Sequence, residues 1–292
     1  MIKNSQERQA RSFERSLILF LFASISWIPS NLFSFSYQHF SDDYSHSIHV
    51  LIVNPKEYAI GAVKATGESI QRETVATLAN RQGAVAAING GFWKLDGSPA
   101  GILKIAQHWY GTPVKPRGAI GWANNGEAVV IDRVLTNYDL NNCSDKSLIE
   151  VFPVSDLHTT SEQWKEMEYI VGGTPLLISR GEIIEDYSSE KTIESFLTRR
   201  HPRTAIGIKN NGDWVFVVVD GQFHSFLGGM TIKELANFMF ALGCTEALNL
   251  DGGGSSTLVI HGMVINDPCG SLPENNKQVE AVSDAILIFD SL

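Results

Sequence analysis

The sequence contains little cysteine and fewer positive than negative charges. Its 292 residues include three cysteines, Cys143, Cys244 and Cys269, with no CxxC pair and no histidines clustered near them, so a zinc site is not expected. One pair could form a disulfide outside the cytoplasm, and the sequence does not choose which. Lysine and arginine number 23 against 32 aspartates and glutamates, a formal net charge of −9. That balance argues against nucleic acid as the main partner, because phosphate backbones are bound by surplus positive charge.

Long apolar runs are also scarce, and the single candidate lies near the N-terminus. A basic segment precedes LILFLFASISWI, Leu17–Ile28. A membrane-spanning helix needs about 20 apolar residues, so this shorter run is more typical of a secretory signal. We therefore expect residues 1–36 to be a signal peptide or an uncleaved signal-anchor, and the mature protein to be extracytoplasmic. A membrane contact is expected only through this segment, if it stays uncleaved.

The rest of the chain has the composition of a folded domain, since 43% of the sequence is hydrophobic and 19% charged. The segment RGAIGWANNGE, Arg117–Glu127, aligns without gaps on RTAIGIKNNGD, Arg203–Asp213. Each copy predicts a strand, an Asn-Asn-Gly turn and a returning strand. We therefore expect one α+β domain over residues 45–290, with a mixed, largely antiparallel sheet, packed helices and two related halves. Chance similarity of two hairpins is the alternative.

A second pattern places a helix and a short strand before a polar, glycine-rich turn. The helix predicted over Glu68–Arg81 leads into the strand Ala84–Ile88 and the turn Asn89-Gly90-Gly91. A capping box, Thr231-x-x-Glu234, opens a later helix that leads into ALNLDGGGSS, Ala247–Ser256. The chain thus repeats the same order of elements.

Four predicted strand ends combine glycine with a polar residue. If neighbouring strands share one sheet, these ends meet at one edge, where glycines let a ligand approach backbone amides. We expect Asp251 and Asp220 to face the resulting cleft, and Arg117 and Arg203 to clamp an oxyanion there. Four independent turns with ordinary glycine preferences are the alternative. The four ends are Asn89-Gly90-Gly91, Gly172-Gly173-Thr174-Pro175, Asp220-Gly221 and Asp251-Gly252-Gly253-Gly254.

Carboxylates, an arginine and glycine amides together suit hydrolysis of a bond between a sugar and a phosphate-bearing group. Two carboxylates on opposite faces of an anomeric carbon perform glycoside cleavage, and a phosphate leaves as a stable anion with little help from an acid. Carboxylate and amide oxygens also suit Ca²⁺ or Mg²⁺, but no EF-hand spacing is present. No metal or other cofactor is therefore predicted.

Seven segments resemble the phosphodiester glycosidase family in their order and spacing, from about Ile48 to Phe289: AAINGGFW, GGTPLLISRG, RHPRTAIGI, VVVDGQ, GMTIKELANFMFALG, ALNLDGGGSSTLVI and AVSDAIL. The resemblance implies hydrolysis of a sugar, such as N-acetylglucosamine, linked through its anomeric carbon to a phosphodiester. The expected partner is then a small or polymeric glycan phosphate. Many bacterial relatives are tied only loosely to exopolysaccharide or envelope processes. The alternative is a non-catalytic envelope or exopolysaccharide-binding protein that uses the same cleft.

The resemblance also implies roles for individual residues. Asp251 is the expected catalytic carboxylate, and Asp220 is its partner. Relatives often have arginine where this chain has Glu280, so either the substrate differs or another base replaces that arginine. The candidate bases are Arg117, Lys115 and Lys104. Together with Arg117, the expected substrate-binding residues are Asn89, Gly90, Gly91, Phe92, Gly173, Thr174, Arg203, Asn249, Gly252, Gly253, Gly254 and Ser255.

Overall fold

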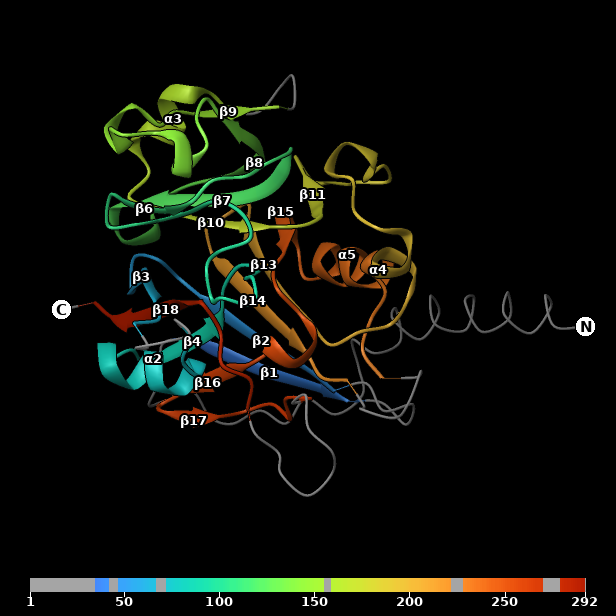
Figure 1. Ribbon diagram of the computed structural model, residues 1–292. Helices are drawn as coiled ribbons and strands as arrows, with labels where there is room; N and C mark the ends of the chain where they lie inside the picture. The colour runs from blue at the N-terminus through green and yellow to red at the C-terminus, as the bar shows by residue number, and fades with distance from the viewer. Residues whose placement is uncertain are drawn as a thin grey trace, which may run out of the picture. The chain divides into compact units, whose positions relative to one another are not determined.

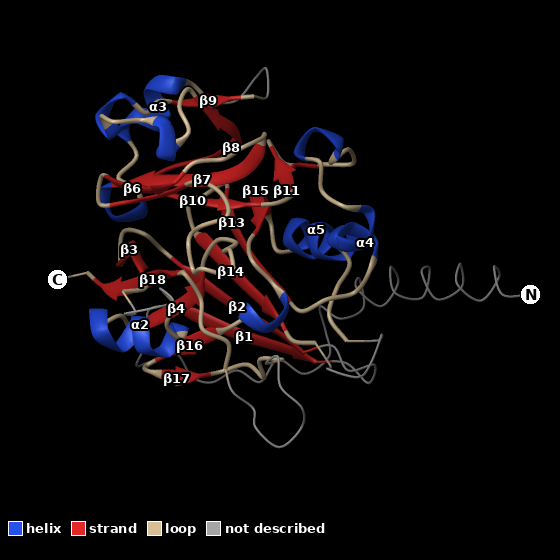
Figure 2. Cartoon of the chain, viewed as in Figure 1, coloured by secondary structure: helices blue, strands red, loops and turns tan. Residues whose placement is uncertain are grey.

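Antiparallel sheets make up most of the protein in the computed structural model, which describes residues 35–41, 47–66, 72–154, 159–221, 228–269 and 279–291. These residues belong to one compact unit, Ser34–Leu292. Figures 1 and 2 show the sheets and the small share of helix. The expected α+β class is confirmed, although the strands divide among three sheets instead of one.

The strands of each sheet come from distant parts of the chain. The seven-stranded sheet has the order β1 (Ser36–Ser41), β2 (Ser47–Val53), β14 (Trp214–Val219), β13 (Arg203–Lys209), β15 (Cys244–Asn249), β11 (Leu176–Ser179) and β12 (Glu182–Ile183). The six-stranded sheet has the order β6 (His108–Gly111), β5 (Leu103–Ile105), β10 (Tyr169–Gly173), β7 (Arg117–Ala123), β8 (Ala128–Thr136) and β9 (Val151–Pro153). The five-stranded sheet has the order β17 (Met263–Val264), β16 (Leu258–Ile260), β4 (Ala86–Asn89), β18 (Asp284–Asp290) and β3 (Tyr58–Lys64).

The three sheets share one hydrophobic core. Trp214 of the seven-stranded sheet, Trp122 of the six-stranded sheet and Ile88 of the five-stranded sheet all belong to it. Each sheet also contacts one helix: α5 (Ile232–Ala241) packs on β11 and β15, α3 (Ser161–Glu166) on β9, and α2 (Val75–Gln82) on β4 and β18. This arrangement explains why strands such as β13 and β14 are buried on both faces.

The predicted halves are visible as a structural repeat. The hairpins β7–β8 and β13–β14 are each followed by a helix, α3 or α5, that opens with a complete capping box at Thr160 or Thr231. The strand after each helix, β10 or β15, pairs antiparallel with the first strand of its own hairpin. The order hairpin, helix, strand therefore occurs twice with the same pairing.

Several predicted boundaries shift in the structure. The helix expected over Glu68–Arg81 begins at Val75, because Thr74 caps it, and it stops at Gly83 as expected, with a φ of 71°. The strand β1 was not predicted from the sequence, and Phe35 beside it is buried in the core. The signal predicted over residues 1–36 lies outside the described residues except for its last two positions, and it stays a prediction.

Two further sequence expectations concern cysteines and membrane spans. Cys143 and Cys244 are free thiols, and Cys244 is buried in β15. The thiol of Cys269 donates to the carbonyl of Gly221 at 2.6 Å. Among the described helices, none is long and apolar enough to cross a membrane.

Candidate active site

The ends of three glycine-bearing strands, β4, β10 and β15, meet. The backbone N–H of Asp251 donates to the carbonyl of Gly90 at 3.2 Å, and the Asn89 side chain donates to the carbonyl of Asp251 at 2.8 Å. The N–H of Thr174 donates to the carbonyl of Asn249 at 2.8 Å. Three of the four expected strand ends therefore bond to one another directly, although their strands belong to three different sheets. The fourth end adjoins them, because the Asn266 amide donates both to Asp220 Oδ1 and to the carbonyl of Ser256.

Close backbone packing explains two of the glycines at this junction. A side chain at Gly90 would overlap the carboxyl of Asp284, and one at Gly173 would overlap the carbonyl of Asn249. Asn89 is fully buried, and its Oδ1 accepts hydrogen bonds from the Thr204 hydroxyl at 2.7 Å and from a backbone N–H at 3.2 Å. Asn89 therefore joins strands and does not present its side chain to a ligand.

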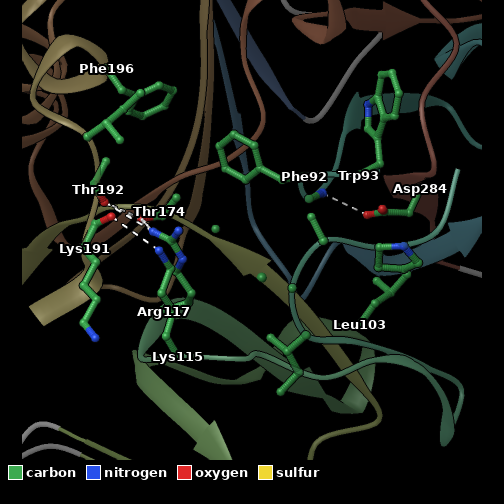
Figure 3. Close-up of a pocket in the computed structure, with 18 residues that line it drawn as sticks. Phe92, Trp93, Leu103, Lys115, Arg117, Thr174, Lys191, Thr192, Phe196 and Asp284 are labelled. Atoms are coloured by element: carbon green, nitrogen blue, oxygen red, sulfur yellow. Dashed lines mark hydrogen bonds between the residues drawn. The ribbon is translucent and has the colours of Figure 1, made fainter. Parts of the chain in front are cut away.

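A cavity of about 400 Å³ opens beside this junction (Figure 3). Its walls combine the aromatic rings of Phe92, Trp93 and Phe196 with polar and charged side chains. Five of the predicted site residues line it: Gly91, Phe92, Arg117, Gly173 and Thr174. The other predicted residues do not line it: Asn89, Gly90, Arg203, Asp220, Asn249, Asp251, Gly252, Gly253, Gly254 and Ser255.

Asp284, which opens β18, lies in the cavity wall and was not predicted as a site residue. Its Oδ2 accepts the backbone N–H of Gly91 at 2.9 Å, and its Oδ1 has no hydrogen-bond partner among the described residues. Burial raises the pKa of Asp284 to about 6. The sequence signal that would have found it is an aspartate inside the segment AVSDAIL, where the last apolar strand begins.

Asp251 lies beside two further carboxylates. Removal from water, together with the charges of Glu280 and Asp284, raises the pKa of Asp251 to about 7. Its Oδ1 accepts the N–H of Gly252 at 2.9 Å, and the residue is partly exposed. We call Asp251, Glu280 and Asp284 the acid cluster.

Ser255 links the acid cluster to the cavity. Its hydroxyl donates to Glu280 Oε2 at 3.4 Å and accepts the indole N–H of Trp93 at 3.4 Å. Trp93 in turn lines the cavity. The predicted residue Ser255 therefore contacts Trp93 and Glu280 but does not line the cavity itself.

Asp220 has different surroundings from those expected. Its Oδ2 lies 3.0 Å from His49 Nε2, and its Oδ1 accepts the Asn266 amide at 2.8 Å and the N–H of Asp267 at 3.1 Å. Burial alone would raise the pKa of Asp220, but the hydrogen bonds from His49 and Asn266 hold it below its ordinary value. The charges that act on Asp251 come from Glu280 and Asp284, and the expected pairing with Asp220 stays a prediction.

Two nitrogens of Arg203 are engaged inside the protein, and its expected role as an oxyanion clamp stays a prediction. The guanidinium is buried: Nε donates to the carbonyl of Met230 at 2.9 Å, Nη2 donates to those of Phe196 at 2.7 Å and Arg199 at 3.1 Å, and Nη1 has no partner among the described residues. It also lies over the Phe196 ring, 4.4 Å from the ring centroid, and burial lowers its pKa to about 10. Arg203 therefore fixes the segment that brings Phe196 to the cavity.

Lys104, one of the candidate phosphate-binding bases, is also engaged elsewhere. Its ammonium donates to the carbonyl of Met167 at 2.7 Å, and the side chain is buried over the Trp109 ring. The other two candidates, Lys115 and Arg117, both line the cavity.

A family model described as phosphodiester glycosidase matches residues 82–289 of this chain. The chain belongs to the phosphodiester glycosidase family. The matched region contains the junction, the cavity and the acid cluster. The resemblance seen in the sequence motifs is thus confirmed.

Individual relatives match more distantly. A prophage-derived protein of Bacillus subtilis, YomE, is 27% identical over 67% of this chain and 27% of its own length. The bovine N-acetylglucosamine-1-phosphodiester alpha-N-acetylglucosaminidase is 32% identical over 36% of this chain and 21% of its own length. The chain therefore spans about a quarter of these curated relatives.

Solved structures show the same fold. The catalytic domain of the zebrafish N-acetylglucosamine-1-phosphodiester alpha-N-acetylglucosaminidase superposes with a TM-score of 0.63 at 19% identity, covering 92% of this chain and 87% of that one. A hypothetical protein from Synechocystis gives a TM-score of 0.67, also at 19% identity, covering 88% of this chain and 62% of that one.

Proposed function

We propose that this protein hydrolyses glycosyl phosphodiesters, releasing a sugar such as N-acetylglucosamine. The observation that carries the proposal is Asp284, a buried carboxyl in the wall of a cavity, with one oxygen that lacks a hydrogen-bond partner in the described chain. Its raised pKa makes it a stronger base than an ordinary aspartate. Family membership and the names of the mammalian and fish relatives support the choice of reaction.

The proposed reaction uses water as the nucleophile. The water oxygen bonds to the anomeric carbon while the bond from that carbon to the phosphate oxygen breaks, and the electron pair leaves with the phosphate. Asp284 accepts the proton of the water. Asp251, whose pKa is about 7 and which is partly exposed, then passes that proton to solvent. The phosphate leaves as an anion and needs no proton.

Two parts of the proposal rest on other grounds. The extracytoplasmic location is supported by the basic and apolar pattern that ends at Ile28. The N-acetylglucosamine-like sugar is supported by the names of the bovine and zebrafish relatives. Asp251 keeps the catalytic role expected from its motif, and Asp284 is proposed as its partner in place of Asp220.

The test is an assay of sugar release by the full chain. UDP-N-acetylglucosamine is the first substrate, and free N-acetylglucosamine is measured against an enzyme-free control. We expect release by the wild type and a loss of about 10²-fold or more in Asp251→Ala. Undiminished release by Asp251→Ala would contradict the role of the acid cluster. Binding of glycan phosphate without turnover would instead identify the non-catalytic alternative.

A further inference from the structure

One wall of the cavity gathers positive charge in a chain whose net charge is −9. Lys115, Arg117 and Lys191 all line the cavity. Figure 3 shows these three side chains on one side and Asp284 with Trp93 on the other. The cavity is therefore cationic at one end and acidic at the other. We call Lys115, Arg117 and Lys191 the cationic wall.

Arg117 is held in place by hydroxyl groups and not by a carboxylate. Its Nη1 donates to Thr174 Oγ1 at 2.9 Å and to Thr192 Oγ1 at 3.3 Å. Its Nη2 and Nε make no hydrogen bond to any described residue. Two parallel donors of the guanidinium are thus available, and such a fork matches the oxygens of a phosphate.

The closest acidic side chain is already saturated by other groups. Glu190 is fully buried, and its Oε1 accepts from Arg133 at 3.0 Å and from the N–H of Leu176 at 2.9 Å. Its Oε2 accepts the Thr174 hydroxyl at 2.8 Å. Because Thr174 donates to Glu190, its oxygen lone pairs face Arg117. Glu190 is therefore a positioning residue for the guanidinium.

The three cations repel one another. The charge of Arg117 is the main reason why the pKa of Lys115 lies below its ordinary value, and Lys191 adds to it. Lys115 Nζ lies 3.4 Å from the carbonyl of Lys191, which brings the two lysines together. No carboxylate among the described residues forms an ion pair with any of the three. A bound anion would relieve this repulsion.

We propose that the cationic wall is the phosphate subsite of this protein, so that the phosphate of the substrate lies on Lys115, Arg117 and Lys191 while its sugar lies towards Trp93 and Asp284. The orientation of the substrate rests on the proposed function, whereas binding of phosphate to the wall does not. The cations then neutralise the departing phosphate, and Asp284 acts from the opposite side.

The test measures binding of inorganic phosphate to the full chain by titration calorimetry, without turnover. The double variant Lys115→Gln/Lys191→Asn removes two charges, and asparagine suits the φ of 50° at position 191. We expect its phosphate affinity to be about tenfold or more below that of the wild type. Lys165→Gln, an exposed lysine on α3, is the matched control and should bind as the wild type does.

Each outcome of the phosphate titration either supports or overturns the proposed phosphate subsite. No phosphate binding by the wild type, equal binding by the double variant, or tighter binding of glucuronate than of phosphate would each overturn it. Loss of phosphate binding in the double variant supports it, even if the wild type releases no sugar. Loss of phosphate binding in the double variant, together with no sugar release by the wild type, would refute the proposed function but not the phosphate subsite. If sugar is released, the double variant should lower kcat as well as raise KM, because the cations act on the departing phosphate.

Discussion

Asp284 and Asp220 are both aspartates buried at the ends of strands, yet their carboxyls are satisfied very differently. Asp284 Oδ2 accepts the N–H of Gly91 at 2.9 Å, and its Oδ1 has no hydrogen-bond partner among the described residues. Asp220 has partners on both oxygens, His49 on one and Asn266 with a backbone N–H on the other. Burial acts on both carboxyls, and the hydrogen-bond donors around them differ.

The difference shows how one residue type serves two purposes. A carboxylate that receives several donors stays ionised and holds segments together, as Asp220 holds β2 beside β14 and the region of Asn266. A carboxyl that is buried with few donors has a raised pKa and exchanges a proton near neutral pH, as Asp284 does. Burial alone therefore does not identify a reactive aspartate.

The largest expected effect separates the two residues by activity. Asp284→Asn should reduce sugar release by about 10²- to 10⁴-fold, because the proton acceptor is lost. Asp220→Asn should retain its rate per folded molecule, because Asp220 does not line the cavity. The rates are measured on the same substrate with the folded fraction determined for each variant. Equal losses of activity in Asp284→Asn and Asp220→Asn would contradict the distinction between the two aspartates.

A smaller effect is expected on stability. Asp220→Asn should lower the free energy of unfolding by about 2–3 kcal/mol at pH 7, because one member of a buried, hydrogen-bonded pair with His49 is lost. Urea denaturation measures it. Asp290→Asn, exposed at the other end of β18, is the control and should stay within about 0.5 kcal/mol of the wild type.

The pH dependence of stability gives an effect of the opposite sign. Because the pKa of Asp284 is raised from 3.8 to about 6, its ionisation destabilises the fold fully above pH 6 and not at all below pH 3.8. Asp284→Asn should therefore gain about 2–3 kcal/mol over the wild type at pH 8 and lose that gain on acidification. Denaturation curves at pH 8 and pH 4 provide the comparison. A gain in the free energy of unfolding that is larger at pH 4 than at pH 8 would contradict this prediction.

The smallest effect concerns Glu280. Its charge is one of the causes that raise the pKa of Asp251, although burial is the larger cause. Glu280→Gln should therefore lower the pKa of Asp251 and move the pH–rate profile to lower pH by a fraction of a unit. The profile of Glu280→Asp should match the wild type, since the charge is kept. A shift to higher pH in Glu280→Gln would exclude this role.

Local sequence patterns predicted the elements well but not the contacts between distant ones. The capping box at Thr231 and the turn residues of both hairpins are local signals, and the structure contains each of them. Three glycine-bearing strand ends meet as expected, because close packing at Gly90 and Gly173 leaves no room for a side chain. The helix start and the turns thus follow from local signals in the sequence.

The failures involve partners far away in the sequence. Asp220 is bonded to His49, which lies 171 residues earlier, and Asp284 to Gly91, which lies 193 residues earlier. Arg203 Nη2 donates to carbonyls of the segment that contains Phe196, which the motif did not predict, and its buried Nη1 has no partner among the described residues. No local pattern encodes which buried polar group receives a partner, and that decides the chemistry here.

A carboxyl titration by carbon-detected NMR tests the central contrast most directly. We expect Asp284 to titrate near pH 6 and Asp251 near pH 7, while hydrogen bonds hold the pKa of Asp220 below its ordinary value. Assignment comes from the single Asp→Asn variants of each residue. Titration of Asp284 and Asp251 near pH 4, or of Asp220 above them, would contradict the account.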